Sequence, residues 1–182
     1  STWAALVVSG LILSHNIMAM IFLPILLVYA LITSPRMIGW IVLGVGTSVY
    51  FWLPALVEQK YVVGLNAASF MDHFPLLAQL LIPSWGTGFS GASFALDEMS
   101  YQIGVIPIIV LFMSVFFSIG SRLQGRDDKF FIAVFFLLVW LGSIILMLPV
   151  SIPIWKALPF IANIQYPWRL LSVGIPIVSF LS

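Results

Sequence analysis

The sequence predicts an all-α fold, a polytopic bundle of transmembrane helices. Hydrophobic residues make up 62% of the 182 residues and charged residues only 7%, whereas a soluble domain carries about 25% charged residues. The mean hydropathy is +1.17. The apolar residues form long continuous runs rather than the short alternating strands of a membrane β-barrel. We therefore expect lipid, not water, to be the main solvent of this chain.

The apolar runs define the expected helices. A helix needs about 20 apolar residues to cross the core of a bilayer, and the runs that approach this length are residues 17–33, 37–53, 101–120 and 130–150. The first ends at Ser34-Pro35-Arg36 and the second at Pro54, because proline does not continue a helix. Residues 2–13 and 169–182 are expected to be truncated helices, which gives about six helical segments.

The chain as a whole, residues 1–182, is expected to form a single transmembrane region. It begins at Ser1 without a basic leader segment and stops at Ser182 within an apolar run. A signal peptide would show a charged segment, an apolar core and a cleavage site. We therefore expect an internal fragment of a larger membrane protein.

The connections between the helices differ in length and charge. The short loops 34–37 and 121–129 hold four basic residues, Arg36, Arg122, Arg126 and Lys129. The long loops 55–100 and 151–168 hold Lys60 and Lys156 and four of the six acidic residues. Basic residues accumulate on the cytoplasmic side of membrane proteins. The sequence therefore predicts a multi-pass protein of the cell membrane with cytoplasmic short loops and external long loops.

The long loops contain two apolar stretches that are too short to cross a membrane. They are residues 74–85 and 152–160, both interrupted by prolines and both containing a tryptophan. Such stretches usually lie in the membrane interface or re-enter it, and tryptophan anchors them at the headgroup level. We expect short interfacial helices in both external loops.

Charge and cysteine content exclude several classes of function. The net charge of +1 argues against nucleic acid as a partner, because binding it requires a clustered basic face. The absence of cysteine excludes a disulfide framework and a cysteine metal site. Membrane lipids are the expected partners. No cofactor follows from the sequence, and a divalent metal stays open.

Polar residues form three clusters in the predicted external segments. The clusters are His15 with Asn16, then Glu58 with Lys60 and Tyr61, and last Tyr166 with Trp168 and Arg169. Because alternating spans return to the same side of the membrane, we expect all three clusters at the external face. They are the candidate substrate-binding residues.

Each cluster contains a residue type with a definable chemistry. The planar guanidinium of Arg169 suits phosphate or pyrophosphate oxygens. The imidazole of His15 is suited to carry a proton, and Glu58 is suited to act as a base or to hold Lys60 or a metal. A structural interpretation exists for each cluster: a helix cap at His15, a solvated pair of Glu58 and Lys60, and an interfacial belt with a snorkelling Arg169.

Three stretches carry a resemblance to a known family. Residues 13–19 (LSHNIMA), 51–61 (FWLPALVEQKY) and 165–171 (QYPWRLL) resemble the prokaryotic polytopic membrane proteins labelled "6-pyruvoyl-tetrahydropterin synthase-related domain, membrane protein". That family is similar to GT-C-type glycosyltransferases, which use lipid-phosphate-linked sugars at the external face. No pterin chemistry is implied, since the chain lacks the zinc-binding histidines of the soluble enzyme.

The resemblance implies a substrate class more than a catalytic centre. It implies that His15, Glu58 and residues 166–169 lie near an external cavity and that Arg169 meets the phosphate of a polyprenyl-phosphate-linked sugar. GT-C-type enzymes carry their catalytic acid in the first external loop. That loop is expected upstream of Ser1, so the resemblance identifies no catalytic residue here.

Two other functions remain open. A lipid or solute transporter, including a flippase, commonly has helices broken by glycine or proline, and Pro24 and Pro107 are the expected breaks within spans. Ionisable residues in the middle of a span would favour transport, but here they lie in loops and at helix ends. The other alternative is a non-catalytic membrane scaffold subunit.

Overall fold

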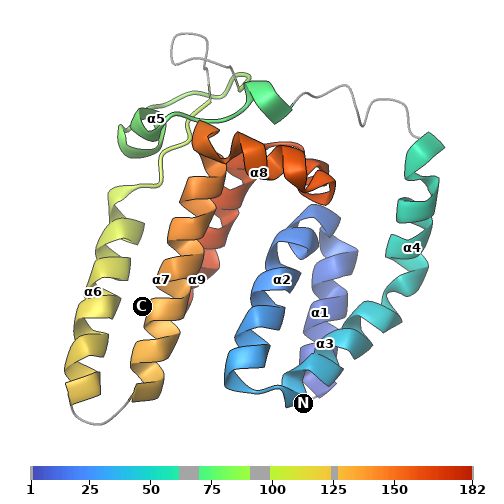
Figure 1. The fold of residues 1–182 in the computed structure, drawn as a ribbon, viewed down its shortest axis with the longest axis horizontal. Helices are drawn as coiled ribbons and strands as arrows, with labels where there is room; N and C mark the ends of the chain where they lie inside the picture. Colours follow the sequence, from blue (N-terminus) through green and yellow to red (C-terminus); the bar gives the residue numbers. More distant parts are fainter. Residues whose placement is uncertain (1, 62–69, 91–98, 124–126, 182) are drawn as a thin grey trace. The chain divides into compact units, whose positions relative to one another are not determined.

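The structure is a computed structural model that describes residues 2–61, 70–90, 99–123 and 127–181. Its elements in these ranges are helices, apart from one isolated bridge between Thr87 and Met99 (Figure 1). The all-α prediction is confirmed for the described residues. The chain divides into two compact units, Ser1–Ala68 and Ser69–Ser182. The expectation of one continuous transmembrane region stays a prediction.

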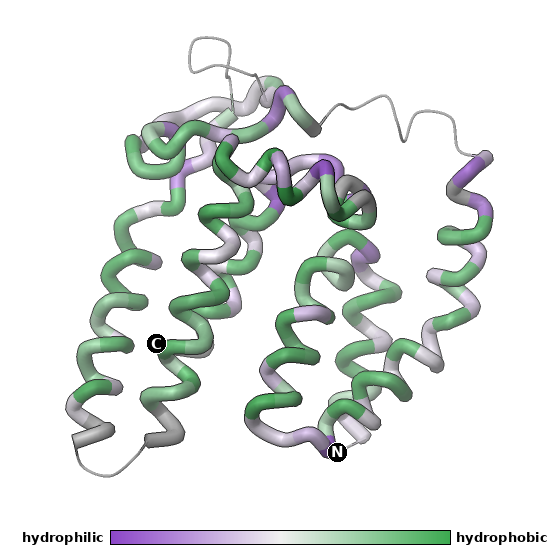
Figure 2. The backbone as a smooth tube through the Cα atoms, viewed as in Figure 1, coloured by the Kyte–Doolittle hydropathy of each residue, from purple (hydrophilic) through white to green (hydrophobic). Residues whose placement is uncertain are grey.

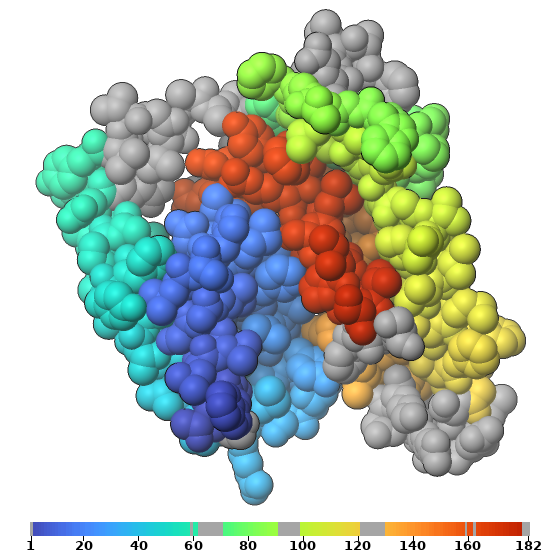
Figure 3. All heavy atoms as spheres, turned by 180° about the vertical axis from the view of Figure 1, so that it is seen from behind, coloured from blue at the N-terminus to red at the C-terminus, as the bar shows by residue number. Residues whose placement is uncertain are grey.

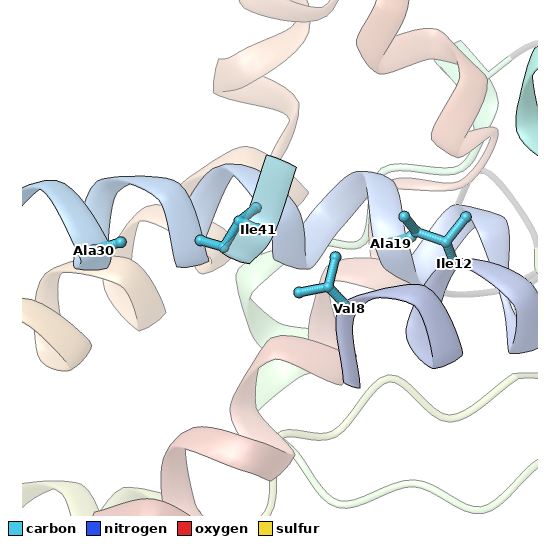
Figure 4. Close-up of a cluster of buried hydrophobic side chains, with 5 residues drawn as sticks. All are labelled: Val8, Ile12, Ala19, Ala30 and Ile41. Atoms are coloured by element: carbon cyan, nitrogen blue, oxygen red, sulfur yellow. The ribbon is translucent and has the colours of Figure 1, made fainter. Parts of the chain in front are cut away.

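The first unit is built around a small apolar core. Its described elements are α1 (Thr2–Ser14), α2 (Asn16–Thr33), α3 (Arg36–Thr47), α4 (Val49–Glu58) and the 3-10 helix η1 (Gln59–Tyr61). Helices α1, α2 and α3 supply the buried side chains of the core, drawn in Figure 4, which are Val8, Ile12, Ala19, Ala30 and Ile41. Helix α4 contributes no buried residue.

Helices α1 and α3 approach each other closely at Gly44. A Cβ atom at this position would lie 2.6 Å from the carbonyl oxygen of Ala5 and 2.7 Å from Cβ of Val8. Ser9 of α1 donates a hydrogen bond to the carbonyl oxygen of Gly44 at 2.9 Å, and its hydroxyl lies 2.6 Å from that of Thr47. Small residues and hydroxyl groups at such contacts are typical of helices that associate in lipid.

The predicted helix 37–53 is observed as two helices, α3 and α4, and it ends later than predicted. The chain bends by 65° between α3 and α4, at Ser48, and α4 continues through Pro54 to Glu58. The hydroxyl of Ser48 donates to the carbonyl oxygens of Gly44 and Val45 at 3.0 Å each. A side chain that inserts into the helical hydrogen-bond ladder in this way causes a kink. The prediction that this helix ends at Pro54 is therefore wrong.

The second unit contains two longer helices and several short ones. Its described elements are η2 (Phe70–Asp72), α5 (Leu77–Leu81), α6 (Val105–Leu123), α7 (Asp127–Met147), η3 (Pro149–Ser151), α8 (Ile152–Ala157), η4 (Pro159–Ile164), η5 (Pro167–Val173) and α9 (Gly174–Leu181). Helices α6, α7 and α9 pack together with η5. Buried side chains at these contacts include Leu111, Trp140 and Val173.

The positions of glycine and proline determine where these helices begin and end, more than the ends of the apolar runs do. The run predicted from residue 101 becomes helical only at Val105, since Gly104 has a φ of +85°, a conformation that favours glycine. The run predicted to residue 150 ends at Met147, just before the proline that begins η3. The last segment starts as the 3-10 helix η5 and becomes α-helical at Gly174.

Pro24 and Pro107 do not break helices as predicted. Helix α2 runs through Pro24 without interruption, and Pro107 is the third residue of α6, in the first turn, where a missing N–H leaves no hydrogen bond unmade. The observed break, at Ser48, has neither proline nor a proline neighbour.

Two described helices are long and apolar enough to cross a membrane. They are Asn16–Thr33 and Phe130–Met147, and the bent pair α3–α4 adds a third if it counts as one span. The apolar helices Thr2–Ser14 and Val105–Gly120 are shorter. The described residues are thus compatible with a membrane protein, while a bundle of six segments stays a prediction, as does its orientation. Residues 62–69, 91–98 and 124–126 of the predicted loops, with Arg126, lie outside the described residues.

The predicted short helices in the long loops are present, but the tryptophans of the two stretches differ in exposure. Helix α5 lies within residues 74–85 and α8 within residues 152–160. Trp85 is 97% exposed, as expected of an interfacial anchor, whereas Trp155 is only 1% exposed. Trp155 packs edge-on against Phe74, with ring centroids 5.6 Å apart. The prediction of an interfacial anchor at Trp155 is therefore wrong.

Candidate functional site

The first predicted cluster, His15 and Asn16, caps a helix. His15 is the N-cap of α2, and its Nδ1 accepts a hydrogen bond from the backbone N–H of Met18 at 3.4 Å. The side-chain oxygen of Asn16 accepts from the N–H of Ile17 at 2.8 Å. Both bonds satisfy N–H groups that a helix leaves unpaired at its start. The geometry supports the structural interpretation of this cluster.

The second predicted cluster lies at the end of α4 and is exposed. Glu58 is the last residue of α4. The Lys60 ammonium lies 4.9 Å from the centre of the Tyr61 ring, a cation–π arrangement that is weak at exposed sites. The end of α4 and the turn between α1 and α2 lie at the same end of the first unit (Figure 1). Among its described residues, however, no hydrogen bond or ion pair joins this cluster to His15 or Asn16.

The third predicted cluster forms a compact aromatic and cationic group in the second unit. The rings of Tyr166 and Trp168 are stacked, with centroids 5.4 Å apart and an angle of 19° between their planes. The guanidinium carbon of Arg169 lies 5.0 Å from the centre of the Tyr166 ring. All three side chains are half-buried. Of the predicted clusters, this is the one in which aromatic faces and a cation come together at a half-buried position.

A strained turn fixes Arg169. Gln165 has a φ of 68°, and the N–H of Tyr166 donates to the carbonyl oxygen of Ile164 at 2.8 Å across it. A bond between residues i and i+2 with positive φ at the centre is a γ-turn, which is rare and strained. Nη1 of Arg169 donates to the same Ile164 oxygen at 2.9 Å and to Oε1 of Gln165 at 3.0 Å. The arginine thus holds the turn closed, and the turn fixes one side of its guanidinium.

The other side of the guanidinium is uncommitted. Among the described residues, the hydrogen bonds that the guanidinium of Arg169 donates both come from Nη1. Burial lowers the pKa of this guanidinium from its ordinary value, and the Coulombic interaction with Tyr166 opposes the shift. An arginine keeps its charge through such a shift. The site therefore offers a fixed cation whose Nη2 and Nε groups can donate hydrogen bonds to a ligand.

Two residues that sequence reasoning missed complete the cluster. The ring of His73 meets Tyr166 edge-on, with centroids 4.9 Å apart, and Nδ1 of His73 is hydrogen-bonded to the hydroxyl of Ser90. His73 follows η2 and Ser90 lies 17 positions later, so only the fold brings them together. The available signal was that His73 is one of only two histidines in the chain.

Trp168 contributes a buried donor to this cluster. Its indole Nε1 is buried without a hydrogen-bond partner among the described residues. The ring also lies 6.2 Å from that of Tyr101, a buried residue that the sequence placed inside a span. A buried N–H without a partner costs about 1–3 kcal/mol. Such a group is commonly explained by a ligand or water that the site accepts.

No metal centre is formed by the described residues. No three of their histidine, aspartate and glutamate side chains come close enough to hold an ion. His15 and Glu58 belong to the first unit and Arg169 to the second. The convergence of all three clusters at one membrane face therefore stays a prediction. Comparison of the chain with family models, with curated proteins and with solved structures finds no match.

Proposed function

We propose that the chain is part of an integral-membrane protein that binds a polyprenyl-phosphate-linked sugar at the external membrane face, in the manner of a GT-C-type glycosyltransferase. The observation that carries the proposal is Arg169, whose guanidinium is held on one side by a strained turn and uncommitted on the other. Two parallel N–H bonds from such a fork match two oxygens of a phosphate.

The residues around Arg169 suit the rest of that ligand. The stacked rings of Tyr166 and Trp168 provide apolar surface for the C–H faces of a sugar or for the first isoprene units. The proposal assigns binding to these residues and assigns the transfer step to none of them.

Removing the Arg169 charge should weaken phosphate recognition. We expect Arg169→Ala to weaken binding of a polyprenyl phosphate by about 10- to 100-fold, because a hydrogen bond to a charged group contributes about 1.5–3 kcal/mol. Arg169→Lys keeps the positive charge but loses the planar guanidinium fork, so its affinity should lie between those of the wild type and Arg169→Ala. Binding is measured by titrating the lipid into protein in detergent micelles and following tryptophan fluorescence.

Two controls separate this role from a general loss of fold or charge. Arg36→Ala removes a basic residue at the start of α3 in the other unit and should leave the affinity unchanged. A polyprenol, which lacks the phosphate, should bind weakly and equally to all variants. Equal affinity of the wild type and a folded Arg169→Ala variant would contradict the proposal and favour the scaffold alternative.

One feature of the structure, the broken helix pair α3–α4, suggests a transporter, but it supports that function less well than Arg169 supports phosphate binding. The broken pair α3–α4 resembles the discontinuous helices of transporters, whose unwound carbonyl groups coordinate an ion. Here the carbonyl oxygens of Gly44 and Val45 already accept from Ser48, and that of Val45 also accepts from Nε1 of Trp52 at 2.9 Å. Filled acceptors at the break favour a structural kink over an ion site.

A further inference from the structure

The segment from Leu76 to Phe89 in the second unit exposes apolar side chains that no described part of the chain covers. Trp85 is 97% exposed and Phe89 is 90% exposed. Between His73 and Asp97 no residue is charged. A soluble surface rarely presents so much contiguous apolar area without a partner.

Helix α5 within this segment buries Leu80 but presents a second apolar face outward. Leu77 and Leu81, four positions apart on one face, are exposed together with the flanking Leu76 and Ile82. The polar Gln79 is buried instead, and its side-chain oxygen accepts from the N–H of Leu76 at 2.7 Å. Figure 2 shows the hydrophobic colouring along α5, and Figure 3 shows atoms of the segment at the molecular surface. This arrangement suits an apolar surrounding and opposes exposure to water.

The segment is continuous with helix α6, which carries an apolar exterior of its own. The N–H of Ile103 donates to the carbonyl oxygen of Leu80 at 2.9 Å, so α5 is held beside the residues that lead into α6. Ile106 and Phe112 of α6 are largely exposed. The apolar exterior of α6 therefore extends to α5. The polar side chains of the segment, Gln79, Ser84 and Thr87, are uncharged, so it offers no charged group for selecting a protein partner.

We propose that residues 76–89 form a membrane anchor that inserts into the interface of the bilayer, with Trp85 and Phe89 at its tip. Tryptophan prefers the headgroup level, and a short apolar element without charge lies in the plane of the interface. The occupant of this surface is lipid, and the proposal does not depend on any bound substrate.

The ends of the anchor are held together beside the candidate site. His73 precedes it and Ser90 follows it, and these two side chains are hydrogen-bonded to each other. The His73 ring in turn meets Tyr166. Insertion of the anchor therefore fixes the depth of the Tyr166–Trp168–Arg169 cluster in the membrane. If the proposed function holds, that depth is the level of lipid phosphates.

The absence of cysteine allows a direct measurement of depth. Trp85→Cys and Phe89→Cys are each labelled with a nitroxide, and the protein is reconstituted without substrate in vesicles of phosphatidylcholine and phosphatidylglycerol. Collisions with oxygen, which concentrates in lipid, are compared with collisions with a water-soluble nickel chelate. Phe112→Cys on α6 is the lipid control, and Lys60→Cys, an exposed charged position in η1, is the aqueous control.

We expect the ratio of oxygen to nickel accessibility at residues 85 and 89 to be severalfold higher than at residue 60 and close to that at residue 112. A ratio like that at residue 60 would overturn the proposal. Labels shielded from both reagents would also overturn it, because they would indicate contact with protein. Leu77→Cys repeats the measurement on α5 if either tip variant fails to fold. Since no substrate is present, failure of the anchor is distinguishable from failure of Arg169 to bind phosphate.

Discussion

Replacing Gly44 with alanine is expected to destabilise the first unit by about 1–3 kcal/mol, the usual cost of forcing extra atoms into a packed contact. The added methyl group would lie 2.6 Å from the backbone oxygen of Ala5, and a backbone atom does not move aside as a flexible side chain does. Helices α1 and α3 must separate, which weakens the bond from Ser9 to the Gly44 carbonyl. The free energy of unfolding is measured in mixed micelles by titration with a denaturing detergent.

Gly46→Ala is the matched control for this prediction. Gly46 lies two residues further along α3, and a Cβ atom there would meet nothing within 4 Å. Alanine is favoured over glycine in a helix by about 1 kcal/mol, so this variant should be as stable as the wild type or more so. Equal destabilisation by both substitutions would show that the close approach of α1 and α3 is not what makes Gly44 necessary.

Trp155→Ala is expected to destabilise the second unit by about 3–5 kcal/mol, the range measured for removal of buried aromatic side chains. The side chain is 1% exposed and packs against Phe74. Its Nε1 donates at 3.0 Å to the carbonyl oxygen of Leu146, one of the last-turn carbonyls of α7 that the helix itself leaves unpaired. The loss is measured in the same way as for Gly44.

Two further substitutions test the origin of the destabilisation by Trp155→Ala: one removes the indole hydrogen bond and the other is a control at an exposed tryptophan. Trp155→Phe removes the N–H donor and part of the indole ring, so we expect a cost above that of one lost hydrogen bond, about 0.5–1.5 kcal/mol, and below that of Trp155→Ala. Ser151 still donates to the Leu146 oxygen at 2.8 Å, which limits that cost. Trp85→Ala removes an exposed tryptophan of the same unit and should change stability by less than about 0.5 kcal/mol. A small effect of Trp155→Ala would contradict the assignment of Trp155 as a core residue.

Hydropathy predicted the positions of the helices better than their ends. The run 17–33 corresponds to α2, and the run 130–150 to α7 and the turn after it, because burial in lipid requires continuous apolar helix. The break at Ser48 was missed. Serine also occurs within straight helices, and what distinguishes Ser48 is that its hydroxyl and the indole of Trp52 take up the freed carbonyls.

The candidate site was predicted in part. Tyr166, Trp168 and Arg169 are neighbours in the sequence, so their association was readable from the motif, and the ring contacts agree with it. His73 and Ser90 were missed, because they reach Tyr166 only through the path of the chain around α5. The strain at Gln165 was also unreadable, since glutamine has no intrinsic preference for a left-handed backbone.

The sequence by itself determined that the chain is helical and suited to lipid, because composition and run length depend on residue type alone. Only the tertiary structure decided which side chains face inward. It buried Trp155 and exposed Trp85, although both lie in short apolar stretches with similar flanking prolines. The physical reason is that Trp155 finds both a ring partner in Phe74 and an unpaired carbonyl at the end of α7. Phe74 comes from a distant part of the chain and Leu146 from the end of the preceding long helix, and hydropathy records neither contact.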